Sequence, residues 1–96
     1  KDKFTFAIYE DQEGTKLIKE VKSDKEEGTA IFEELRFGTY FIKEIKAPKG
    51  YELSDRVVKV EINGKGVFID DELTEESDNT VTFNFENKKI EVPKTY

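Results

Sequence analysis

Short stretches of alternating apolar and polar residues, separated by turn residues, most strongly limit how this chain can fold. In residues 3–9, Phe4, Phe6 and Ile8 fall on one face of a strand, because successive side chains of a strand point to opposite faces. Similar strands are predicted at residues 15–22, 29–32, 39–46, 56–62, 67–70 and 80–88. No segment shows a sustained helical period. About seven short, evenly spaced strands are typical of an all-β, immunoglobulin-like β-sandwich.

The length of 96 residues is that of a single domain. We expect the sandwich to occupy residues 1–90, and residues 91–96 to begin an extended linker. The chain starts at Lys1, without Met and directly before a strand, so we expect it to be part of a longer protein. No apolar run approaches the length of a membrane span, and no signal peptide is visible.

The composition excludes several classes of function. His, Cys and Met are absent, so Ser–His or Cys–His catalysis, disulfide bonds and thiolate zinc sites are impossible. The 16 basic and 22 acidic residues give a net charge of −6. An acidic chain without a basic cluster is a poor candidate for binding nucleic acid or an anionic membrane. We predict no cofactor and no metal ion.

Two other segments suggest local structure or chemistry. Residues 63–66, Asn-Gly-Lys-Gly, predict a β-hairpin, because Asn-Gly suits a type I′ turn. Residues 70–78 form an acidic loop whose carboxylates could bind Ca²⁺, but they do not fit the EF-hand pattern, and a solvated loop is the preferred interpretation. Paired carboxylates also occur in glycosidases, but with 22 acidic residues in 96 their proximity carries little information.

One carboxyl group is placed on an apolar strand. Tyr40, Ile42 and Glu44 share one face of the strand at residues 39–46, although Phe41 and Ile45 make the opposite face apolar too. If Tyr40 and Ile42 face the core, Glu44 does as well. A buried carboxylate without a partner is costly, so such a group takes up a proton or pairs with another group.

An amide is placed in a similar way on the last predicted strand. Asn87 continues a face whose earlier members are all apolar, namely Val81, Phe83 and Phe85. Glu44 and Asn87 could therefore meet in one core. The simpler interpretation is a hydrogen bond from a neutral Glu44 to the Asn87 carbonyl. The alternative is a reactive pair.

A series of motifs runs through the chain in a recognisable order. They are Phe6-Ala7-Ile8-Tyr9, Gly28-Thr29-Ala30-Ile31-Phe32, Leu35, Gly38-Thr39-Tyr40, Glu44, Ala47-Pro48-Lys49-Gly50-Tyr51 and Asn87-Lys88-Lys89. Together they resemble the B-type domain of the Cna collagen adhesin, the CnaB or prealbumin-like fold of Gram-positive pilins and surface adhesins. The resemblance covers essentially the whole chain, and residues 40–51 resemble the glutamate box of that family.

The resemblance implies an intramolecular isopeptide bond. In that family a Lys on the first strand condenses with an Asn on the last strand, and ammonia leaves. By position, Glu44 is the proton-shuttling acid and Asn87 the cross-link acceptor. Lys1 and Lys3 are available as donors, but their strand parity is opposite to that of Phe4. We therefore expect the lysine-bearing strand to lie outside this sequence.

Three functions follow from the resemblance. The first is a structural stalk module of an extracellular, cell-wall-anchored pilin or adhesin, with neighbouring domains of the same protein as partners. The second is a strand-accepting fragment that captures a lysine-bearing peptide by β-augmentation. The third is an adhesin domain that binds host extracellular matrix. In none of them is the chain an enzyme with turnover, because the bond would form once per molecule.

Overall fold

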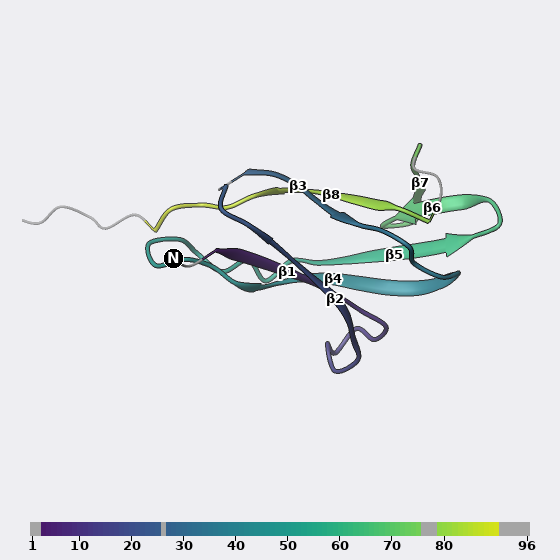
Figure 1. Cartoon of the computed structure of the whole chain (residues 1–96), viewed down its shortest axis with the longest axis horizontal. Coiled ribbons are helices and arrows are strands. Elements are labelled where there is room, and N and C mark those ends of the chain that lie inside the picture. Colours follow the sequence, from purple (N-terminus) through teal and green to yellow (C-terminus); the bar gives the residue numbers. More distant parts are fainter. Residues whose placement is uncertain (1–2, 26, 76–78, 91–96) are drawn as a thin grey trace, which may run out of the picture.

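The computed structural model describes residues 3–25, 27–75 and 79–90, and the regular structure of these residues is entirely β-strand (Figure 1). The strands are β1 (Phe4–Tyr9), β2 (Leu17–Ser23), β3 (Glu27–Phe32), β4 (Gly38–Lys46), β5 (Val57–Asn63), β6 (Gly66–Ile69), β7 (Glu72–Leu73) and β8 (Val81–Glu86). The ends of the predicted strands agree with these to within two residues. The short β7, inside the predicted acidic loop, was not predicted. No helix in the described ranges could cross a membrane.

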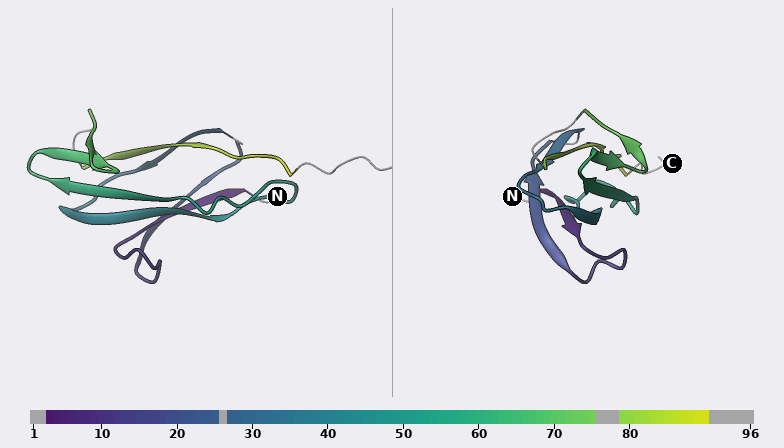
Figure 2. Two further views of the ribbon diagram at one scale, coloured as in Figure 1. Left: turned by 180° about the vertical axis from the view of Figure 1, so that it is seen from behind. Right: turned by 90° about the vertical axis from the view of Figure 1, so that its right-hand side faces the viewer.

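The strands form two antiparallel sheets that pack face to face (Figure 2). The larger has the order β2-β1-β4-β5-β6-β7, and the smaller contains β3 and β8. In the larger sheet, β1 lies between β2 and β4, with Phe6 opposite Val21 on one side and Glu44 on the other. The predicted all-β sandwich is therefore confirmed.

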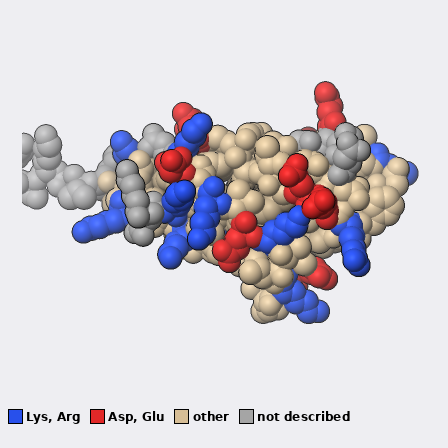
Figure 3. Space-filling view, in the orientation of Figure 1, with Lys and Arg blue, Asp and Glu red and all other residues tan. Residues whose placement is uncertain are grey.

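The apolar core fills the space between the two sheets. On β1 and β4 the alternate residues predicted to face inward are buried, and Ile8 and Ile42 have no exposed surface. The core consists of Phe4, Phe6, Ile8, Ala30, Phe32, Leu35, Tyr40, Ile42, Val58, Val60, Ile62, Val67, Val81 and Phe85. On the face shown in Figure 3, charged side chains of both signs are interspersed along the length of the molecule.

The hairpin between β5 and β6 occurs where it was predicted, but its turn is not type I′. Asn63 pairs with Gly66, so Gly64 and Lys65 are the two central residues. The positive φ, 135°, belongs to Gly66, whereas a type I′ turn needs positive φ at both central positions. Instead, the Lys65 N–H donates to Asn63 Oδ1 at 2.8 Å. The Asn63 side chain thus organises this turn.

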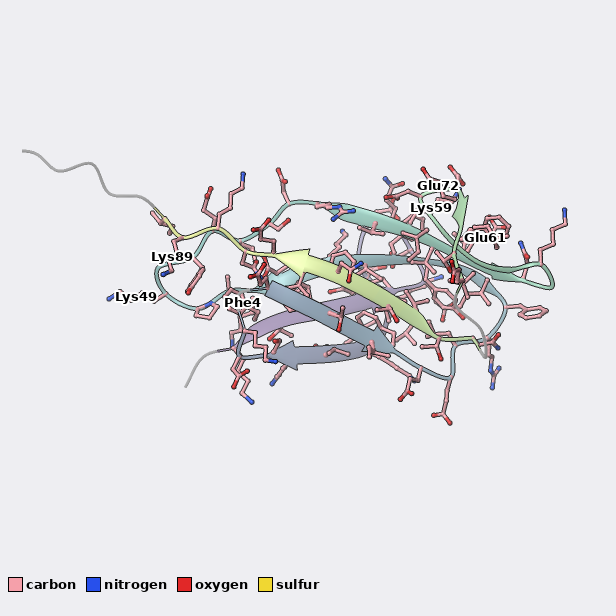
Figure 4. The ribbon with its side chains drawn as sticks, turned by 90° about the horizontal axis from the view of Figure 1, so that it is seen from above. Phe4, Lys49, Lys59, Glu61, Glu72 and Lys89 are labelled. Atoms are coloured by element: carbon pink, nitrogen blue, oxygen red, sulfur yellow. The ribbon has the colours of Figure 1, made fainter. Side chains whose placement is uncertain are left out.

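The start of β1 and the segment after β8 lie at the same end of the sandwich, where Figure 4 labels Phe4 and Lys89. The Phe4 ring packs edge-on against Tyr51, with the ring centroids 4.9 Å apart. Tyr51 in turn forms a β-bridge with Lys89, and the Glu52 N–H donates to the Lys88 carbonyl at 2.9 Å. The segment after β8 therefore leaves its own sheet and is held by the loop that follows β4.

Candidate functional site

Glu44 and Asn87 lie at this same end, on elements from opposite sheets. Glu44 belongs to β4 in the larger sheet, next to Phe6 of β1. Asn87 directly follows β8 of the smaller sheet. Their exposed fractions are 7% and 8%, and with Thr5 they are the buried polar residues of the described chain. The face of β4 that carries Tyr40, Ile42 and Glu44 is thus the buried one, which is one of the two faces that the sequence left open.

The two side chains are in direct contact. With its amide nitrogen turned toward Glu44, Asn87 donates to Oε2 at 2.6 Å and to Oε1 at 3.0 Å. This arrangement suits an ionised carboxylate, which can only accept hydrogen bonds. A protonated Glu44 is a donor, and it suits the opposite rotation of the amide, with Asn87 Oδ1 facing the acid. The pair thus has a satisfied arrangement for either charge state of Glu44.

The surroundings of Glu44 favour its neutral form. Burial raises the pKa of the Glu44 carboxyl above its usual value of 4.5, because the charged form loses its hydration. The Ser54 N–H donates to Glu44 Oε1 at 2.8 Å and acts in the opposite direction, since it stabilises the charged form. Desolvation is the larger effect, so the pKa is raised overall. A carboxyl group with a raised pKa keeps its proton to a higher pH than an exposed Glu and can serve as a proton donor.

A small cavity of about 60 Å³ adjoins the pair. One part of its wall is aromatic, with Phe6 packed against Phe85 at a centroid distance of 4.4 Å and against Phe83 at 5.7 Å. The Arg56 guanidinium lies over the Phe83 ring, 5.6 Å from its centroid. A cavity of this size has room for water molecules or for the end of a side chain. Burial against the aromatic part of this wall would lower the pKa of a bound amine.

The described residues place no lysine in this cavity, which is lined by Phe6, Glu44, Ser54, Arg56, Phe83, Phe85, Glu86 and Asn87. Lys3 is exposed, and Lys1 lies outside the described residues. The cavity adjoins β8, and within the described part of the chain β8 pairs only with β3, along one edge. Along the other edge of β8, Figure 4 shows no strand of the same sheet.

Sequence reasoning missed two of the residues around Glu44. Both lie in the irregular segment between Tyr51 and β5. Ser54 was outside every predicted strand, and Arg56 was predicted as the first residue of the strand at 56–62 but precedes β5. The Arg56 N–H donates to Ser54 Oγ at 3.2 Å, which folds this segment back on itself. A Ser two residues before an Arg is too common to have indicated such a turn.

The acidic loop shows no metal-binding geometry in its described part, residues 70–75. Asp70 accepts from the Lys59 N–H at 3.1 Å, and Asp71 pairs with the Lys59 ammonium at 3.3 Å. Figure 4 labels Lys59 with its neighbours Glu61 and Glu72 at this far end of the molecule. Among the described residues, no three or more Asp or Glu side chains lie close enough together to hold a metal ion. These carboxylates contact a cation of the chain itself.

A scan against protein-family models matches residues 2–77 to the SpaA prealbumin-like fold domain. The chain belongs to this family. The family consists of structural, generally non-enzymatic domains of surface pilins. The matched residues include Glu44 but end before β8 and Asn87. No curated protein and no solved structure matches the chain significantly.

Proposed function

We propose that this chain is a stalk module of a Gram-positive surface pilin or adhesin in which Asn87 becomes joined to a lysine through an isopeptide bond. The observation that carries the proposal is the buried contact between the Glu44 carboxyl and the Asn87 amide. Membership of a family of pilin domains supports the extracellular stalk role. Neighbouring domains of the same surface protein are then its structural partners.

The chemistry needs only these two residues and an amine. Burial of a lysine amine against the phenylalanine rings of the cavity lowers its pKa and so favours the neutral, nucleophilic form. Its nitrogen attacks Cγ of Asn87 while Glu44 gives its proton to the amide oxygen. Glu44 then takes a proton from the attacking nitrogen and passes it to the amide nitrogen, which leaves as ammonia. One C–N bond forms, one breaks, and the Glu44 carboxyl regains its proton from the amide oxygen.

Holding the reactants together supplies most of the acceleration. Amines do not attack unactivated amides in water at a useful rate, but well-oriented groups in a fold reach effective concentrations of about 10⁵–10⁸ M. The buried acid adds a factor of about 10²–10⁴. The reaction occurs once, because its product is part of the fold.

The open edge of β8 is where the lysine would arrive. An unpaired strand edge offers its N–H and C=O groups to another strand. A strand paired there would direct alternate side chains toward the cavity beside Phe83 and Asn87. That strand could belong to the same protein or to a separate peptide. The open edge is the specific feature that favours strand capture from a separate peptide as the second candidate function.

The test is a scan of lysine positions on an added strand. A short strand of alternating Val and Thr is joined before Lys1 by a flexible Gly-Ser linker, and a single Lys replaces each Val in turn. We expect at least one of these fusions to lose one ammonia without any enzyme, as measured by the intact mass. Peptide mapping should then locate the new bond at Asn87.

Matched variants separate the proposed reaction from side reactions. Asn87→Ala and Glu44→Gln should abolish the loss of ammonia, whereas Asn84→Ala, on the exposed face of β8, should leave it unchanged. If every folded fusion keeps its full mass, Glu44 and Asn87 form only a hydrogen-bonded core pair, and the proposal is wrong. A bond at another residue would refute the role of Asn87.

A further inference from the structure

The two oxygens of the Glu44 carboxyl have different surroundings. Oε1 accepts the Ser54 N–H at 2.8 Å. Oε2 is the oxygen nearer to the Asn87 amide, at 2.6 Å against 3.0 Å for Oε1. A carboxyl group can rotate about its Cγ–Cδ bond, so this asymmetry must be imposed from outside. Ser54 is the residue that distinguishes the two oxygens.

The direction of the Ser54 N–H is set by a backbone contact that precedes it in the same segment. Two residues earlier, the Glu52 N–H donates to the Lys88 carbonyl at 2.9 Å. Two residues later, the Arg56 N–H donates to Ser54 Oγ at 3.2 Å, a side-chain contact that Ser54→Ala would remove. Lys88 is the immediate neighbour of Asn87. The segment that holds the acid is therefore fastened to the segment that carries the amide.

We propose that the Ser54 N–H is the positioning group of this site, which holds Glu44 Oε1 as an acceptor so that the proton of the acid resides on Oε2 and points at the Asn87 amide oxygen. This inference rests on the proposed function, because it concerns the same carboxyl group. In a carboxylic acid the carbonyl oxygen is a better acceptor than the hydroxyl oxygen. An N–H held at Oε1 therefore favours the proton on Oε2.

The consequence for the reaction is that Glu44 is aligned before a lysine arrives. The proton on Oε2 can be donated to the amide oxygen as the lysine nitrogen attacks Cγ, with no rotation of the carboxyl group. Such preorganisation is the usual source of large rate effects from residues that do not touch the reacting atoms. Arg56 and Glu86 are the other charged residues that line this cavity.

The decisive variant is Ser54→Pro, because proline has no N–H. Ser54→Ala is its matched control, since it removes only the hydroxyl group. In the chain without an added strand, we expect the titration midpoint of the Glu44 carboxyl carbon, followed by NMR, to move to higher pH in Ser54→Pro and to change little in Ser54→Ala. In the fusion that reacts best, the maximal rate of ammonia loss should fall about 10- to 100-fold in Ser54→Pro only.

A measurement on the unsubstituted chain decides the question even if Ser54→Pro does not fold. The Ser54 amide proton should shift with pH with the same midpoint as the Glu44 carboxyl carbon, because its acceptor changes from a carboxylate to a carbonyl oxygen. A Ser54 amide that does not follow the Glu44 titration overturns the inference, whether or not any fusion reacts. An unchanged reaction rate in a folded Ser54→Pro variant overturns it as well. If no fusion loses ammonia but the Ser54 amide proton follows the Glu44 titration, only the proposed cross-link is refuted.

Discussion

Replacing Asn87 by Ala should destabilise the unreacted chain by an amount that depends on pH. The Asn87 amide is buried and lies within hydrogen-bond distance of both Glu44 oxygens, at 2.6 and 3.0 Å. When Glu44 is charged, Asn87→Ala removes a hydrogen bond to a buried charge, which costs about 1.5–3 kcal/mol. When Glu44 is protonated, the lost bond is between neutral groups and costs about 0.5–1.5 kcal/mol.

The sign follows from which form the amide stabilises. The hydrogen bond donated by Asn87 favours the charged form of Glu44. Removing this bond therefore lowers the free energy of unfolding most at pH values where Glu44 is ionised. We therefore expect the free energy of unfolding to fall more at about pH 9 than at about pH 3, on either side of the raised pKa of Glu44. For a domain of this size, each 1 kcal/mol corresponds to about 4–8 °C in Tm.

Urea unfolding at the two pH values is the appropriate assay, and tyrosine fluorescence can report it because the chain has four Tyr and no Trp. Asn84→Ala, an exposed change on the same strand, should stay within about 0.5 kcal/mol of the parent chain at both pH values. In a Glu44→Gln background, Asn87→Ala should lose its pH dependence. An equal decrease in the free energy of unfolding at both pH values would refute the reasoning. So would a pH dependence of Asn87→Ala that persists unchanged when Glu44→Gln is present.

Three further predictions concern stability alone. Burial raises the pKa of Glu44 above 4.5. The contribution of Glu44 to the free energy of unfolding is therefore most favourable below pH 4.5, and it is lost as pH rises through the folded-state pKa. Glu44→Gln should raise Tm relative to the parent chain at about pH 9 but not at about pH 3. Ile42→Val, at a site with no exposed surface, should cost about 0.5–1.5 kcal/mol in denaturant unfolding, whereas Ile45→Val, at 38% exposure on the same strand, should cost less. Gly50 has a φ of 95°, so Gly50→Ala should lower the free energy of unfolding by about 1–3 kcal/mol. Gly64 has open space around it and no positive φ, and an equal decrease in Gly64→Ala would contradict this explanation.

The sandwich and its inward faces could be predicted because alternation has a local cause. Phe4, Phe6 and Ile8 are all buried, as their spacing indicated. The parity of Glu44 and Asn87 indicated which way each side chain points. The resemblance to a known family then supplied a reason to connect them, and the family match agrees with it for residues 2–77.

The turn at residues 63–66 shows where local reasoning reached its limit. The Asn-Gly pair indicated a hairpin correctly, but the turn type depends on which two residues sit at its centre, and strand pairing decides that. In the structure Asn63 pairs with Gly66, so the two central residues are Gly64 and Lys65, one position later than the Asn63-Gly64 pair that suits a type I′ turn. The Asn63 side chain then serves as a hydrogen-bond acceptor.

By itself, the sequence determined that the chain is all-β, that Glu44 shares a face with Tyr40 and Ile42, and that Asn87 shares one with Phe85, since side chains in a strand alternate whatever the rest of the molecule does. Only the tertiary structure decided that Glu44 and Asn87 meet, because they come from different sheets and no local pattern sets how two sheets are superposed. It also decided that Ser54 holds one oxygen of the acid, because the direction of a loop N–H depends on distant backbone partners such as Lys88.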